Sequence, residues 1–148
     1  MLLNTIFHGD CFDFLSSVPS NSVDAIISDP PYNTTALKWD KKIDWDKFWC
    51  ETKRILRLPT SVVALFSAQP FTTDLINSNR KDFRYELIWE KSIASGFLDA
   101  NKRPLRTHEN ILIFSEKFGG SIYNPQKFQG EPYRNKGRRG GGDLWRFK

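Results

Sequence analysis

The stretch Val23-Asp-Ala-Ile-Ile-Ser-Asp-Pro-Pro-Tyr-Asn33 decides how the rest of the sequence is interpreted. Its first half, residues 23–28, is a mostly apolar run bounded by turn residues, which is typical of a buried parallel strand. The run stops at Asp29-Pro-Pro-Tyr32, where two prolines fix φ and remove two backbone N–H donors. The sequence therefore predicts a strand followed by a stiff turn that is rich in hydrogen-bond acceptors.

Strand and helix patterns alternate on both sides of this stretch. The predicted strands, bounded by turn residues, cover residues 4–8, 23–28, 61–67, 83–90 and 110–115. The predicted helices, with apolar residues at helical spacing, cover residues 11–18, 44–58 and 70–78. Asp10 is the expected cap of the first helix, and residues 92–107 are an expected loop. This alternation indicates an α/β fold with a largely parallel sheet, which binds ligands at the carboxyl ends of its strands.

Length and composition favour one soluble domain. The 148 residues are 39% hydrophobic and include five Trp and twelve Phe, which excludes a disordered chain. No run of 18 apolar residues occurs, and the N-terminus reaches Asp10 too early for a secretory signal, so we expect no membrane partner. Cys11 and Cys50 form neither a disulfide framework nor a metal cluster. We therefore expect a reduced, cytoplasmic protein without a metal.

The net charge of +5 is concentrated near the end of the chain. Residues 117–148 hold eight basic and two acidic side chains and seven of the nine glycines. Such a segment can bring several cations to the phosphates of DNA. The cations of its central part are Arg134, Lys136, Arg138 and Arg139. A solvated, flexible terminus is the alternative interpretation.

The Asp29–Tyr32 turn suits an amino group on a nucleobase. Such a group has two N–H donors, and its lone pair is delocalised into the ring. Accepting hydrogen bonds from both hydrogens favours a pyramidal nitrogen and frees the lone pair for attack. Tyr32 can stack on the base, which contributes about 1–3 kcal/mol. The alternative is an ordinary rigid turn after a strand.

Ser28-Asp-Pro-Pro-Tyr-Asn33 resembles the catalytic loop of the DNA methyltransferases that methylate amino groups of adenine or cytosine from S-adenosylmethionine. Three further segments follow the order of the group in which this loop precedes the cofactor glycine loop, namely His8-Gly-Asp-Cys11, Leu87–Lys91 and His108–Ser115. The aspartate that heads the loop favours adenine. A cytosine-amino enzyme and a non-catalytic nucleic-acid-binding remnant are the alternatives. A restriction-modification or phage setting fits the resemblance.

The resemblance implies roles for individual residues. The implied catalytic residues form the loop itself, Asp29, Pro30, Pro31 and Tyr32. The Asp29 carboxylate and the Pro30 carbonyl would accept hydrogen bonds from the target amino group, and Tyr32 would stack on a base flipped out of double-stranded DNA. The implied S-adenosylmethionine contacts are Asp10, Cys11 and Asp29. The implied DNA contacts are Asn33 and the four tail cations Arg134, Lys136, Arg138 and Arg139.

The same resemblance implies a longer chain. The family's cofactor site includes an aromatic-x-Gly-x-Gly loop after a strand, and Gly140–Gly142 follows two arginines instead. In the family sheet, two central strands lie between the strands of residues 4–8 and 23–28 and are encoded later. We therefore expect an incomplete Rossmann-like sheet, with a partial catalytic domain over 1–116 and the start of a target-recognition region over 117–148. A complementing C-terminal fragment or a second copy is the expected protein partner.

Overall fold

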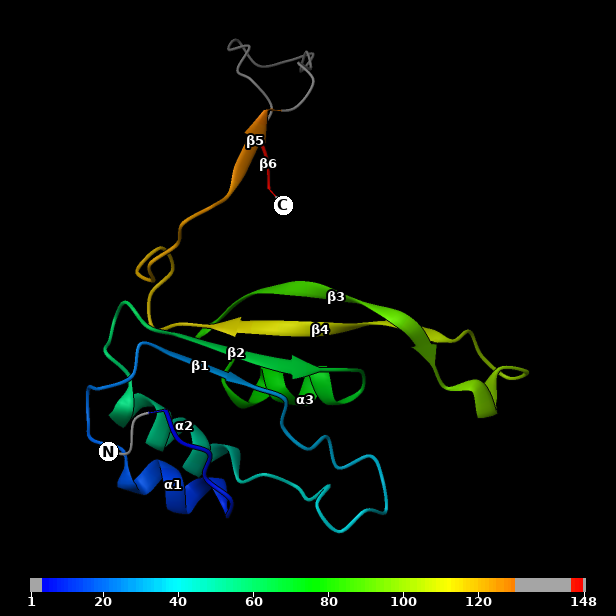
Figure 1. The fold of residues 1–148 in the computed structure, drawn as a ribbon, viewed down its shortest axis with the longest axis horizontal. Helices are drawn as coiled ribbons and strands as arrows, with labels where there is room; N and C mark the ends of the chain where they lie inside the picture. The colour runs from blue at the N-terminus through cyan, green and yellow to red at the C-terminus, as the bar shows by residue number, and fades with distance from the viewer. Residues whose placement is uncertain (1–3, 130–144, 148) are drawn as a thin grey trace.

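The computed structural model describes residues 4–129 and 145–147 (Figure 1). Its main sheet has four strands in the order β1-β2-β4-β3, with β1 Ala25–Ser28, β2 Val62–Ser67, β3 Phe83–Ser95 and β4 Arg106–Phe114. The helices are α1 Cys11–Ser17, α2 Trp45–Ile55, α3 Phe71–Ser78 and the 3₁₀ turn η1 Phe97–Asp99. A separate two-stranded sheet pairs β5 (Lys127–Gln129) with β6 (Trp145–Phe147).

Strand direction differs from the prediction. β1 pairs with β2 in parallel, whereas β4 is antiparallel to both β2 and β3. A largely parallel sheet is therefore wrong for the described part of the chain. A parallel pair needs a crossover, and α2 supplies it between β1 and β2. β3 instead turns back directly into β4, a connection that pairs strands antiparallel.

Residues 4–8, which we predicted as a strand, belong to no sheet. The side chain of Ile6 is 97% exposed. An apolar pattern becomes a strand only where a neighbour completes the hydrogen-bond ladder, and no described strand lies beside this segment. The prediction of a strand here is wrong. The next element is as predicted, because α1 begins at Cys11 and the Asp10 Oδ1 accepts a 2.8 Å hydrogen bond from the Phe12 N–H.

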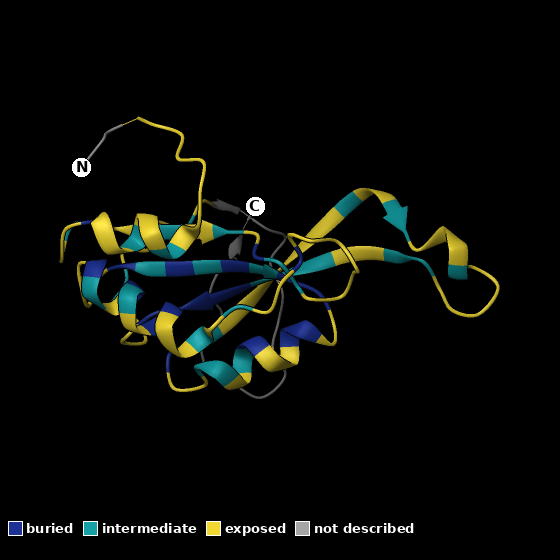
Figure 2. Ribbon diagram, turned by 90° about the horizontal axis from the view of Figure 1, so that it is seen from below, coloured by how far each residue is buried: buried dark blue, intermediate teal, exposed yellow. Residues whose placement is uncertain are grey.

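All three α-helices lie on one face of the main sheet (Figure 1), which we call the covered face. Its core joins strand residues to α2 and α3, and comprises Phe48, Trp49, Leu56, Val63, Leu65, Phe71, Leu75, Leu112 and Phe114. Buried residues gather between the helices and the sheet (Figure 2). The predicted apolar stripe of α2 is confirmed at Phe48, Trp49 and Ile55, although the helix ends at Ile55 rather than Leu58.

The opposite face, which we call the open face, carries apolar side chains without a described helix over them. Strand register places Ile27 beside Ala64 and Leu87 beside Ile111 on this face. Ile27 is 74% exposed and Leu87 is 50% exposed. Residues 23–28 and 83–90 are thus edge strands, and the expectations of a buried and a half-buried strand are wrong. An apolar run signals a tendency to be buried, but neighbouring elements decide whether burial happens.

Arg54 on α2 fastens α1 to the covered face. Its guanidinium donates 2.7 Å hydrogen bonds to the carbonyls of Leu15 and Val18, and it pairs with Glu51 at 2.7 Å. The last carbonyls of a helix have no partner within the helix. Arg54 satisfies two carbonyls at the end of α1, and this orients α1 beside β1.

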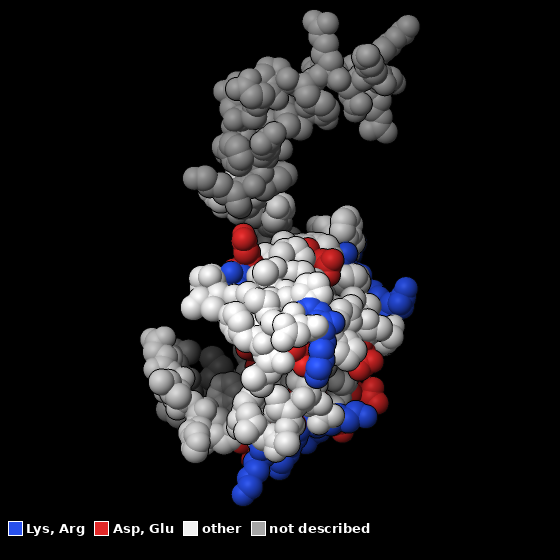
Figure 3. Space-filling model, turned by 90° about the vertical axis from the view of Figure 1, so that its right-hand side faces the viewer, with Lys and Arg blue, Asp and Glu red and all other residues white. Residues whose placement is uncertain are grey.

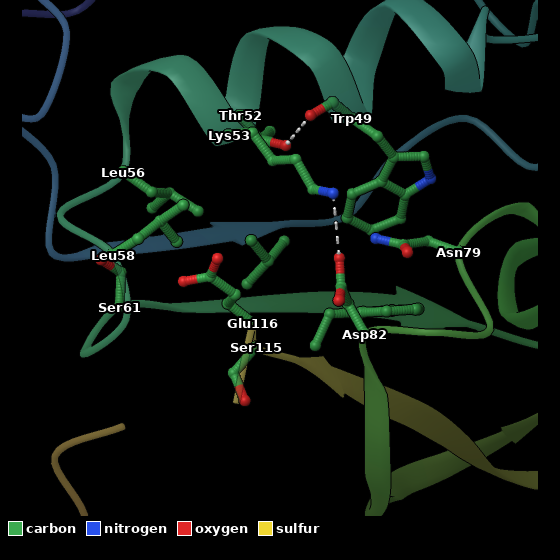
Figure 4. A pocket seen from close by; sticks show the side chains of 12 residues that line it. Trp49, Thr52, Lys53, Leu56, Leu58, Ser61, Asn79, Asp82, Ser115 and Glu116 are labelled. Carbon is green, nitrogen blue, oxygen red and sulfur yellow. Dashed lines mark hydrogen bonds and ion pairs between the residues drawn. The ribbon is translucent and has the colours of Figure 1, made fainter. Parts of the chain in front are cut away.

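A small cavity of about 30 Å³ lies where α2 meets the start of β3 and the end of β4 (Figure 4). Lys53 Nζ lies 3.5 Å from Oδ2 of the buried Asp82. The Asp82 carbonyl accepts a 2.9 Å hydrogen bond from the Ser115 N–H. These contacts join a helix to two strands, so we interpret this cavity as part of the structural framework.

Candidate active site

The Asp29–Tyr32 turn follows the carboxyl end of β1, as the sequence predicts. Pro30 is buried, whereas Asp29 is exposed. The two prolines restrict the backbone, and the burial of Pro30 anchors it. The turn therefore presents the Asp29 carboxylate on a rigid base at the edge of the sheet.

Tyr32 is held on two sides. Its hydroxyl donates a 2.9 Å hydrogen bond to Oδ1 of Asp29. Its ring stacks on Phe71 with centroids 4.8 Å apart and planes 18° apart. Burial, followed by the hydrogen bond and the charge of Asp29, raises the pKa of Tyr32. The ring is thus fixed in place as a neutral phenol, and its hydroxyl occupies one acceptor oxygen of Asp29.

The loop of residues 33–40 follows the turn, and the buried Asp40 at its end holds the start of the loop. The Asp40 carboxylate accepts hydrogen bonds of 2.5–2.8 Å from the N–H groups of Asn33, Thr34 and Thr35 and from the Thr35 hydroxyl. Burial raises the pKa of Asp40, but these hydrogen bonds outweigh it and lower the pKa overall. We did not predict this role, since no local pattern marks an aspartate that binds amides five to seven residues earlier.

Three tryptophans lie in or after this segment. Trp45 and Trp49 pack among the aromatic rings of the covered face, with ring centroids 5.3 Å and 5.1 Å from Phe48. Trp39 is different, because its side chain is 68% exposed at the tip of the loop. The loop therefore offers a flat apolar surface near the turn.

Tyr32 lines three cavities, of which two also include residues of β4. One of about 300 Å³ is lined by the Asp29–Tyr32 turn, Asp40 and Glu109, and one of about 410 Å³ by Tyr32, Gln69, Arg103 and Arg106. Volumes of this size accommodate a small ligand. The charge of Glu109 contributes to the raised pKa of Tyr32, and the charge of Arg106 opposes it. We did not predict a role for Glu109, Arg103 or Arg106 at this site, because only the pairing of β3 with β4 brings these side chains to the turn.

Another cavity, of about 550 Å³, lies between α1 and β1 and brings together Cys11 and Asp29. Most of its lining is apolar and includes Phe14, Leu15 and Ile26. Partial burial and then the charge of Asp10 raise the pKa of the Cys11 thiol. This thiol is therefore not activated as a nucleophile. The predicted cofactor residues Cys11 and Asp29 share a cavity, and Asp10 precedes Cys11 as the cap of α1.

The predicted DNA contacts divide into two groups. Asn33 is exposed at the start of the loop closed by Asp40. The other four, Arg134, Lys136, Arg138 and Arg139, lie outside the described residues, so their role stays a prediction. Within residues 4–129 and 145–147, no three His, Cys, Asp or Glu side chains are grouped to hold a metal ion. No helix in the same ranges is long and apolar enough to cross a membrane.

Comparison with known sequences gives relatives of one kind. The chain is 26% identical to the Type II methyltransferase M.BglII of Bacillus subtilis over 99% of this chain and 49% of that protein. It is 32% identical to the DNA adenine methyltransferase YhdJ of Escherichia coli K12 over 81% of this chain and 44% of that protein. The chain thus spans about half the length of these curated relatives. No protein-family model matches it.

Solved structures with a similar fold are DNA methylases. A candidate DNA modification methylase of Thermus thermophilus gives a TM-score of 0.54 at 22% identity, over 80% of this chain and 54% of that one. The complex of M1.HpyAVI with SAM gives a TM-score of 0.53 at 18% identity, over 86% of this chain and 61% of that one. These likenesses show the fold, and the predicted Rossmann-like α/β sheet is confirmed over the part of these structures that the chain spans. In its Asp-Pro-Pro-Tyr turn at a strand end and over about half the length of these relatives, the chain is similar to DNA methyltransferases.

Proposed function

We propose that this chain forms the target-base half of an S-adenosylmethionine-dependent methyltransferase that acts on the amino group of adenine in double-stranded DNA. The observation that carries the proposal is the exposed Asp29 carboxylate, held beside the stacked Tyr32 ring at the mouth of a cavity. This activity would place the protein with DNA in the cytoplasm.

The turn acts on the amino group through its acceptors. The Asp29 carboxylate and the Pro30 carbonyl accept one hydrogen bond each from a flipped adenine, which frees the nitrogen lone pair. The Tyr32 hydroxyl donates its hydrogen bond to Oδ1 of Asp29, so Oδ2 of Asp29 is left to accept from the amino group. The ring face of Tyr32 opposite Phe71 stacks on the base. Fixed acceptors of this kind need no rearrangement during the reaction.

The residues between α1 and β1 fit the adenosine part of S-adenosylmethionine. Their cavity of about 550 Å³ has apolar walls that suit a purine ring, with Cys11 and Asp29 on its lining. Asp10 adjoins it and has one carboxylate oxygen that does not cap α1. When bound, this cofactor supplies an electrophilic methyl group. The sequence has no aromatic-x-Gly-x-Gly segment for the methionine end, so the fit covers half of the cofactor.

The test measures methyl transfer from labelled S-adenosylmethionine to double-stranded DNA. The chain is assayed alone and mixed with a polypeptide covering the part of YhdJ that it does not match. We expect little transfer alone and transfer to adenine in the mixture. Asp29→Ala should then lose about 10²–10³-fold in rate. Asp46→Ala, an exposed aspartate in the first turn of α2, is the matched control and should keep the rate.

Three results would contradict the proposal. Label recovered on cytosine after nucleoside mass spectrometry would reassign the substrate. DNA binding without any transfer in the mixture would favour a non-catalytic nucleic-acid-binding module. Equal rates for Asp29→Ala and Asp46→Ala would remove Asp29 from the catalytic role.

We further propose that a polypeptide equivalent to the unmatched half of the relatives covers the open face and pairs with the edge of β1. β1 is an edge strand of the described sheet and carries the exposed Ile27, and Leu87 on β3, at the opposite edge, exposes apolar surface on the same face. Exposed apolar strand edges favour association. Sedimentation of the mixture should show a one-to-one complex that Ile27→Lys disrupts. A dimer of the chain alone, lost in Ile27→Lys, would make a second copy the occupant instead.

A further inference from the structure

The β3–β4 hairpin extends beyond the body of the sheet. The last pair between β2 and β4 is Ser67 with Asn110, so β4 residues 106–109 have only β3 beside them among the described strands. We call residues 89–109, with η1 at the tip, the arm. In Figure 1 the arm reaches past the carboxyl ends of β1 and β2, which is also the side of the Asp29–Tyr32 turn.

The arm is ordered by its own contacts. Lys91 and Glu109 form an ion pair between its strands, and Arg106 donates a 3.3 Å hydrogen bond to the Gln69 carbonyl on the body. At the tip, the Asp99 carbonyl accepts hydrogen bonds from the N–H groups of Lys102 and Arg103. A two-stranded ribbon without a partner is only marginally stable, so this much internal order calls for an explanation.

The tip of the arm combines apolar side chains with cations. Phe97 is 62% exposed and Leu98 is fully exposed, and both belong to η1. The arm holds four basic side chains and three acidic ones, Glu90, Asp99 and Glu109. At the tip, Asp99 pairs with Arg103 at 2.9 Å and with Lys102 at 3.9 Å, so the two cations exceed this carboxylate by one charge. Figure 3 views this end of the molecule, where uncharged surface lies beside Lys and Arg side chains. Exposed apolar side chains flanked by cations match a polyanion with an apolar interior, which is duplex DNA.

The arm borders the candidate active site. Gly96, Arg103 and Arg106 line the cavity of about 410 Å³ together with Tyr32. The same hairpin therefore reaches from the stacking tyrosine to an apolar tip. A duplex bound by the tip would present its nucleotides close to the turn.

We propose that the arm enters duplex DNA and that Phe97 and Leu98 fill the gap left in the base stack by the flipped nucleotide. Removing a base from the stack costs a few kcal/mol, and apolar wedges at opened base steps are an established way to stabilise the distorted duplex. Lys102 and Arg103 contact the flanking phosphates. The inference rests on the proposed function, because it takes DNA as the substrate.

The test uses the full chain and two duplexes that differ only by one abasic-site analogue. Fluorescence anisotropy should show about tenfold tighter binding to the abasic duplex, because its gap is already open. The double variant Phe97→Ala/Leu98→Ala should lose this preference. The matched control is Phe118→Ala/Ile122→Ala, which removes an equally exposed aromatic and aliphatic pair after β4 and should keep it.

The outcomes separate the two proposals. A wild-type chain without preference for the abasic duplex, or a tip variant that keeps it, overturns the role of the arm whatever the methylation assay gives. Asp29→Ala should retain the preference, since the turn is not part of the arm. A tip-dependent preference without methyl transfer in the mixture would support the arm and contradict the proposed function.

Discussion

The covered face and the open face of the sheet carry similar apolar side chains and differ in what lies on them. On the covered face, Leu65 and Leu112 are fully buried under α2 and α3. On the open face, Ile27 and Leu87 are at least half exposed. The faces alternate along the same strands, so the amino-acid composition of a strand does not distinguish them. What distinguishes them is that the described part of the chain supplies helices for one face only.

The largest expected effect compares two leucines on neighbouring strands. Leu112→Ala removes a fully buried side chain and should lower the free energy of unfolding by about 2–5 kcal/mol. Leu87→Ala on the open face should change it by less than about 0.5 kcal/mol. Urea unfolding of both variants measures the difference. Similar losses would show that something covers the open face in solution.

The second test concerns how α1 is held on the covered face. Arg54→Ala leaves the carbonyls of Leu15 and Val18 without their guanidinium partner and should cost about 1.5–3 kcal/mol. Arg57→Ala is the matched control, because Arg57 pairs with Asp24 on the surface, where such pairs contribute about 0–1 kcal/mol. An Arg54 variant as stable as the Arg57 variant would mean that apolar contacts alone hold α1.

Local features were predictable from the sequence. The Asp10 cap, the start of α1 and the rigid Asp29–Tyr32 turn depend on side chains within a few residues of each other. Their physical causes, a short acceptor before a helix and two consecutive prolines, are visible in any window of sequence. The stripe of α2 was predictable for the same reason.

Features set by distant neighbours were not predictable. Residues 4–8 have the pattern of a strand and no strand to pair with among the described residues. Exposure of Ile27 and Leu87 depends on which elements cover the sheet. Glu109 and Arg106 reach the turn only because β4 pairs with β2 and β3 in antiparallel registers. A pattern within one segment carries no information about these pairings.

The third test asks whether the hydrogen bonds to Asp40 order the 33–40 loop without help from packing against either face of the sheet. Asp40→Asn removes a carboxylate that accepts four hydrogen bonds and should speed trypsin cleavage at Lys38 and Lys41 several-fold, with little change in global unfolding. Asp46→Asn, an exposed aspartate on α2, is the control. An unchanged cleavage rate in Asp40→Asn would show that packing orders the loop.

The pH dependence of this loop has a definite sign. The pKa of Asp40 is lower in the folded protein than its ordinary value of 3.8. The unfolded chain therefore takes up the proton first as the pH falls, so the stabilisation is present above pH 3.8 and is lost as the pH falls through the folded pKa. The amide NMR signals of Thr34 and Thr35 should move in this acid range in the wild type. They should not follow that titration in Asp40→Asn.

The smallest expected effect lies in the turn, where the two faces of the sheet end. Tyr32→Phe removes one hydrogen bond to Asp29 and should cost less than about 1 kcal/mol at neutral pH, because Asp29 is exposed to water. The pKa of Tyr32 is raised above its ordinary value of 10.0, so the unfolded chain loses this proton first and stability falls as the pH rises above 10.0.

Urea unfolding at several alkaline pH values tests this slope. Tyr32→Phe should flatten it, whereas Tyr85→Phe on the open face should leave it as in the wild type. Identical slopes for all three proteins would mean that the Tyr32 hydroxyl does not hold Asp29 in solution. Both carboxylate oxygens of Asp29 would then be free to receive the amino group of the target base.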